Sequence, residues 1–130
     1  MQDIFIIVFF VAFFINLLYE LLHSLLYTTC TEAPLETYVQ LMLKAAAFDG
    51  FAIVMLYAAT VLIFPARYHL AAFSILSLLF AYGWEIYSLK KKKWEYSEKM
   101  PTVFGAGITP SIQLMFTGIL SICIASRLFV

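Results

Sequence analysis

Four long apolar segments, separated by polar connections, constrain the fold of this chain more than any other feature. They cover about residues 4–27, 38–64, 68–90 and 109–128. A membrane-spanning helix needs about 20 predominantly apolar residues, and apolar residues here do not alternate as the strands of a membrane β-barrel require. The pattern therefore predicts an all-α integral membrane four-helix bundle, with a longer lysine-rich connection between the third and fourth helices.

The composition excludes a water-soluble domain. Hydrophobic residues make up 64% of the 130 positions and charged residues 12%, whereas a soluble domain carries about 25% charged residues. This length suits one transmembrane domain over residues 1–130. Eight basic residues balance eight acidic ones, so the chain lacks the net positive charge that would favour binding to nucleic acid. We expect the lipid bilayer to be its main partner.

Prolines and lysines delimit the predicted helices. Pro34 and Pro65 interrupt the first two connections, because proline cannot continue a helix that precedes it. Lysines 90–93 end the third segment, since four consecutive charges resist burial. Thr109 followed by Pro110 is typical of an N-cap and a first helical residue, so we expect the fourth helix to begin there.

The distribution of basic residues predicts the orientation. The connections 28–37 and 90–108 lie on one side of the bundle and hold five lysines, whereas the other side holds only Arg67 and Arg127. The positive-inside rule places the lysine side in the cytoplasm. Both termini of this multi-pass protein are then non-cytoplasmic. Trp94 and Tyr96, beside the lysines, are interpreted as part of the aromatic belt at the membrane interface.

Polar residues recur at helical spacing inside the apolar segments. Asn16, Glu20 and His23 lie on one face of the first helix, and buried ionisable groups usually face the interior of a bundle. The depth of these residues predicts one polar pocket that is open toward the cytoplasm. The predicted catalytic residues are Glu20, His23, Asp49 and Glu85, and the predicted substrate-binding residues are Asn16, Tyr27, Lys44, Tyr82 and Gln113.

The Glu-x-x-His motif at Glu20 and His23 permits two interpretations besides acid/base chemistry. These two side chains can ligate one divalent metal ion, as such pairs do in helix bundles, and no other cofactor is indicated. Alternatively, Glu20 only holds helices together through hydrogen bonds to Lys44, Tyr27 or Gln113.

Three functions fit this pattern, and we favour a membrane-embedded enzyme that acts on a lipid or isoprenoid-like substrate. A pocket near the headgroup boundary admits both water and the reactive end of a lipid. The first alternative is a proton- or cation-coupled transporter that works as a homodimer, for which Asp49 is the deepest acid. The second is a non-catalytic membrane assembly subunit that uses the small residues Ala45, Ala46 and Gly50 for close helix contact.

Overall fold

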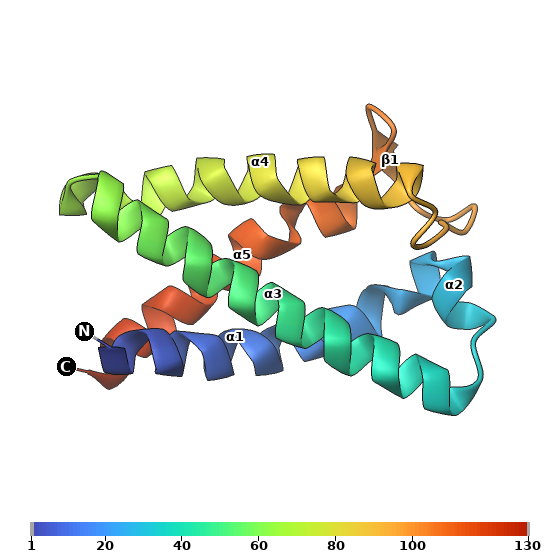
Figure 1. Cartoon of the computed structure of the whole chain (residues 1–130), viewed down its shortest axis with the longest axis horizontal. Coiled ribbons are helices and arrows are strands. Elements are labelled where there is room, and N and C mark those ends of the chain that lie inside the picture. The colour runs from blue at the N-terminus through green and yellow to red at the C-terminus, as the bar shows by residue number, and fades with distance from the viewer. Residues whose placement is uncertain (1, 130) are drawn as a thin grey trace.

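The computed structural model describes residues 2–129, and 81% of the chain is helical. Within this part of the chain four long helices are each long and apolar enough to cross a membrane. They are α1 (Gln2–His23), α3 (Leu35–Ile63), α4 (His69–Lys90) and α5 (Ile108–Leu128) (Figure 1). The prediction of a mostly helical chain with four such helices is confirmed. The connections contain η1 (Ser24–Leu26), α2 (Thr28–Thr31), η2 (Ala66–Tyr68), β1 (Thr102–Val103) and β2 (Ala106–Gly107).

Helix boundaries differ from the sequence prediction at two starts. Helix α3 begins at Leu35 rather than near residue 38, directly after Pro34, whose extended backbone forms the N-cap. Helix α5 begins at Ile108 with Gly107 as its N-cap. The prediction that Thr109 caps this helix is therefore wrong. Its hydroxyl contacts the sulfur of Met100 instead, because the β1–β2 hairpin carries the chain into the helix two residues earlier.

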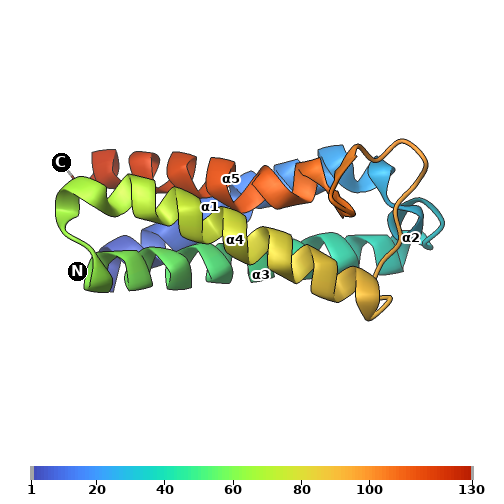
Figure 2. The same ribbon diagram turned by 90° about the horizontal axis from the view of Figure 1, so that it is seen from above.

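The helices place the chain connections at two opposite ends of the molecule. Both termini and the turn between α3 and α4 lie at one end, which we call the termini end, and α2 and the β1–β2 hairpin lie at the other, which we call the loop end (Figures 1 and 2). Helix α1 packs against α3 and α5, while α4 packs against α5 and α3. Helices α3 and α4 are close at their connecting turn and separate toward the loop end (Figure 1).

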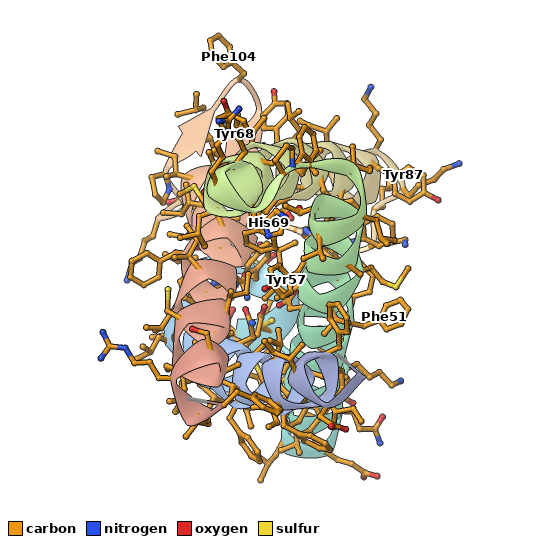
Figure 3. All side chains as sticks on the ribbon, turned by 90° about the vertical axis from the view of Figure 1, so that its left-hand side faces the viewer. Phe51, Tyr57, Tyr68, His69, Tyr87 and Phe104 are labelled. Atoms are coloured by element: carbon orange, nitrogen blue, oxygen red, sulfur yellow. The ribbon has the colours of Figure 1, made fainter. Side chains whose placement is uncertain are left out.

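A dry apolar core fills the termini end. Val8, Ile53 and Phe73 are completely buried there, one each from α1, α3 and α4. Viewed from the termini end, Tyr57 points into the space among the helices, whereas Phe51 and Phe104 point outward (Figure 3). No charged residue belongs to this core within the described residues.

Small residues allow the closest helix contacts. A Cβ atom at Gly50 of α3 would lie 3.3 Å from the backbone oxygen of Phe9 in α1. Ala12 and Ala46, on the same two helices, are fully buried. At the crossing of α4 and α5, Gly118 leaves room for the buried Phe73 ring, which an added Cβ would overlap. The small-residue face expected on the second helix thus contacts α1.

Replacement of Gly118 by alanine tests this packing. Because the Phe73 ring is completely buried, it has nowhere to move, and such overpacking costs about 1–3 kcal/mol. Gly118→Ala should therefore unfold at a lower temperature than the wild type when circular dichroism is followed on heating. Gly83→Ala is the matched control, because no atom lies within 4 Å of the added Cβ. A similar loss in both variants would contradict the packing described.

Candidate functional site

A cavity of about 290 Å³ lies at the loop end, where α3 and α4 separate. Side chains from α1 and α5 form its floor, and residues of the two loop-end connections border it. Exposed Lys44 and Phe48 on α3 line one edge and partly exposed Trp84 on α4 lines the opposite edge, so the mouth is on the α3–α4 side. The polar and ionisable lining residues include Glu20, His23, Tyr27, Lys44, Asp49, Glu85, Lys93, Trp94 and Gln113.

Gln113 of α5 forms hydrogen bonds to polar side chains of α1 and α3. Its amide nitrogen donates to Glu20 Oε1 and Asp49 Oδ2, each at 2.8 Å, and to Asn16 Oδ1 at 3.0 Å. An amide carries only two hydrogens, so two of these acceptors share one hydrogen. The carboxyl groups of α1 and α3 are thereby held around a single nitrogen atom.

His23 and Glu20 form the one ion-pair contact within residues 2–129. His23 Nε2 lies 3.3 Å from Glu20 Oε2, one helical turn away. A neutral imidazole in this contact carries its proton on Nε2 and leaves Nδ1 as an acceptor. Nδ1 is buried and has no hydrogen-bond partner among the described residues. In the neutral form of His23 this nitrogen therefore has a lone pair that no described residue uses.

Glu85 of α4 is held by three donors from the two loop-end connections. Its Oε1 accepts from Tyr27 Oη at 3.1 Å, Trp94 Nε1 at 2.9 Å and Tyr96 Oη at 2.5 Å. The Tyr96 oxygen also accepts the backbone N–H of Gly107, which leaves its own hydrogen free for Glu85. The carboxylate is thus fixed by neutral donors rather than by a cation.

Residues 91–107, which we call the strap, return over the loop end to supply two of those donors. Backbone hydrogen bonds tie the strap to the other connection, from Thr28 N to Glu95 O at 3.0 Å and from Ser97 N to Leu26 O at 2.8 Å. The Glu95 amide also donates to the Thr29 hydroxyl. The strap is therefore attached through its backbone as well as through Glu85.

The interpretation of Trp94 and Tyr96 as belt residues missed these contacts. Both aromatic side chains direct their polar atoms to Glu85. A buried acid needs hydrogen-bond donors. Residues one helical turn from Glu85 on α4 supply none to it among the described residues. That requirement, together with the indole and phenol donors soon after Glu85, is the signal that could have identified them.

The structure places most predicted site residues at the cavity and corrects two. Tyr82 does not line it, because it follows the cavity-lining Ala81 by about 100° around α4. Its hydroxyl instead donates to the Phe104 carbonyl of the hairpin. Asn16 lies behind the lining, where it accepts hydrogen bonds from Gln113 and Thr117.

The geometry distinguishes between the interpretations of Glu20. Of its three expected partners only Gln113 bonds to it, because Tyr27 donates to Glu85, and Lys44 forms no ion pair within residues 2–129. In the same part of the chain no group of three or more His, Cys, Asp or Glu side chains is arranged to hold a metal ion. Glu20 and His23 thus form a pair of candidate ligands rather than part of a larger set.

The environment of Glu85 changes the acidity of its two phenol donors. Burial, reinforced by the nearby Glu85 carboxylate, raises the pKa of Tyr27 well above its ordinary value. Burial and the hydrogen bond to Glu85 likewise raise the pKa of Tyr96, although the Gly107 amide opposes the shift. Both phenols therefore remain protonated donors across the neutral range.

Comparison with known proteins assigns no function to this site. No protein-family model matches the chain, and neither a curated protein nor a solved structure is significantly similar to it. The function must therefore be inferred from the side chains at the cavity.

Removal of the Gln113 amide should destabilise the fold. Gln113→Ala leaves Glu20 Oε1 and Asp49 Oδ2 without this donor, whereas Asn16 Oδ1 keeps the Thr117 hydroxyl, and each unsatisfied buried group costs about 1–3 kcal/mol. The expected result is a clearly lower unfolding temperature by circular dichroism. Gln40→Ala removes an exposed glutamine from α3 and should shift the unfolding free energy by no more than about 0.5 kcal/mol. Equal stability of the two variants would argue against the bridging role.

The raised pKa of Tyr27 predicts a loss of stability at alkaline pH. Above about pH 10 the unfolded chain releases the phenol proton, whereas the folded chain retains it. The folded state then binds more protons, so the free energy of unfolding falls as the pH rises. Tyr27→Phe should reduce this slope by up to about 1 kcal/mol per pH unit. Thermal unfolding between pH 8 and 11 measures it, and an unchanged slope would contradict the assigned environment.

Proposed function

We propose that α1, α3, α4 and α5 each span a membrane, with the loop end in the cytoplasm and both termini on the opposite side. The four spans have the required length and hydropathy. Large apolar side chains are exposed along them, such as Leu22 at 80% and Leu62 at 85%, and lipid would cover such surfaces better than water. The lysines at positions 90–93 support the orientation.

On this placement we propose that the protein is a membrane-embedded enzyme that acts on a lipid or isoprenoid-like substrate. The observation that carries the proposal is that Glu20, His23, Asp49 and Glu85, from three helices, line one cavity. The mouth of that cavity lies between α3 and α4, where a molecule dissolved in the bilayer would arrive. The loop end also brings the cavity near water, which a proton-transfer reaction needs.

The side chains can divide the chemistry among them. Glu20 and Asp49 surround one amide nitrogen, and two carboxyl groups this close can hold one proton between them, which makes the pair able to donate or accept. A neutral His23 can relay a proton through Nδ1, which no described residue contacts, with Glu20 fixing the ring through Nε2. Glu85 is immobilised by its donors, so its negative charge is suited to stabilising a positive charge that develops during the reaction.

The dry core favours an enzyme over the coupled transporter. Transport requires access to the site from both sides of the membrane. Between the cavity and the termini end lie the completely buried Val8, Ile53 and Phe73, whereas the buried ionisable groups collect near the loop end. A site reached from one side suits a reaction on a lipid, whereas a transporter would have to open a second path through this packed core.

Neutralisation of the acid pair should abolish turnover. The protein is reconstituted into nanodiscs that contain the total lipid extract of its host cell, and lipid conversion is followed by mass spectrometry. Loss of a general acid or base costs about a hundredfold or more, so Glu20→Gln and Asp49→Asn should each lower the rate by that factor while keeping side-chain size.

Glu36→Gln is the matched control, because Glu36 is an exposed acid in the first turn of α3 and should leave the rate unchanged. Full turnover by Asp49→Asn would contradict the proposal. So would proton-driven uptake by wild-type proteoliposomes that this substitution abolishes, which would instead support the transporter.

A further inference from the structure

Glu85 has one oxygen without a donor. The three hydrogen bonds from Tyr27, Trp94 and Tyr96 all go to Oε1, and no hydrogen bond among the described residues uses Oε2. The residue is only 3% exposed, yet it lines the cavity. Oε2 is thus the oxygen that remains available to a molecule inside the cavity.

Among residues 2–129 no cation forms an ion pair with this carboxylate. Its three donors are neutral, and the ion-pair contact found within residues 2–129 joins His23 to Glu20 instead. A buried carboxylate without a counter-charge is costly. A cationic ligand whose charge lies beside Oε2 would reduce that cost, whereas an anion would meet Glu85 together with the Glu20 and Asp49 carboxyl groups.

Aromatic rings form much of the cavity wall. Phe48, Trp84 and Trp94 line it, and the faces of aromatic rings attract ammonium groups. The chain itself provides an example at the mouth, where Lys93 Nζ lies 4.5 Å from the centroid of Trp84 and 5.1 Å from that of Tyr87. The rings at this edge are therefore already arranged around one ammonium group.

We propose that the cavity binds an alkylammonium group, a primary or quaternary amine on an apolar chain, with its nitrogen at Glu85 Oε2 and its chain leaving between α3 and α4. This inference rests on the proposed function for the location of the substrate, and it narrows the substrate to an amine-bearing amphiphile. It needs no particular reaction at the acid pair.

The lysines at the mouth are the argument for an anionic ligand instead. Lys44 and Lys93 line the cavity, but both are exposed and can extend their charges into water. The carboxyl groups lie deeper and cannot. A ligand at the base of the cavity therefore meets the Glu85 carboxylate and the Glu20–Asp49 pair rather than the exposed lysines, which favours the ammonium.

Tryptophan fluorescence measures occupancy directly, because the two tryptophans of the chain, Trp84 and Trp94, both line the cavity. The purified protein in a neutral maltoside detergent is titrated with dodecyltrimethylammonium and, separately, with dodecyl sulfate. The cation should change the emission saturably, and the anion should not. Tetramethylammonium then tests whether the headgroup alone binds, since competition would indicate a free amine and its absence a lipid-borne one.

Two substitutions and a control locate the binding. Glu85→Gln should weaken binding of dodecyltrimethylammonium about tenfold or more, because it removes the buried negative charge that attracts the cation. Glu95→Gln, on the exposed surface of the strap, should leave it unchanged. Lys44→Gln removes an exposed like charge and should strengthen it, which provides a test even if Glu85→Gln fails to fold.

Equal affinity of wild type and Glu85→Gln for the cation would overturn the inference, as would saturable binding of dodecyl sulfate that Lys44→Gln abolishes. The outcomes for reaction and ligand are separable. Cation binding without any lipid turnover would reject the proposed enzyme and retain the ammonium site. Lipid turnover without cation binding would reject the ammonium site and retain the proposed enzyme.

Discussion

The burial of the Glu85 carboxylate is the constraint on which the loop end depends. A buried charge is tolerated only when hydrogen bonds replace its lost water, and hydrogen bonds to charged groups are each worth about 1.5–3 kcal/mol. The donors come from residue 27 and from the strap, so one carboxylate on α4 links both connections. Because Tyr96 also accepts from Gly107, the same network reaches the start of α5 and the floor of the cavity.

The two ends of the helices follow different physical rules. At the termini end small residues and interlocking apolar side chains, among them Gly118 against Phe73, leave a dry interior. At the loop end α3 and α4 separate, and polar side chains satisfy one another across the space, with Gln113 as the shared donor. A cavity of ionisable groups is stable here because the packed half holds the helices in register.

Helical periodicity was sufficient to predict what lies within single helices. The spacing of Asn16, Glu20 and His23 placed them on one face, and all three are buried. Apolar length likewise identified the four long helices, with ends displaced by a few residues where Pro34 and the hairpin altered the cap. These features are local, so a sequence pattern can carry them.

The missed features depend on contacts between segments distant in the sequence. Tyr82 was predicted to bind substrate, but its hydroxyl donates to the backbone carbonyl of Phe104 in the hairpin. The roles of Trp94 and Tyr96 depend on the path of the strap. Its hairpin reverses at Phe104 and Gly105, both with positive φ, a two-residue turn that favours hairpin pairing but does not reveal where the hairpin docks.

The contact between Trp94 and Glu85 can be measured by solid-state NMR on protein reconstituted in lipid. Indole ¹⁵N and glutamate carboxyl ¹³C labels give a dipolar coupling that falls steeply with distance. With Trp94 Nε1 at 2.9 Å from Glu85 Oε1, one indole of the two should couple strongly to a glutamate carboxyl, and Glu85→Gln should remove that signal. Absence of the coupling from both indoles would mean that the strap does not hold Glu85, and the account of the cavity would be wrong.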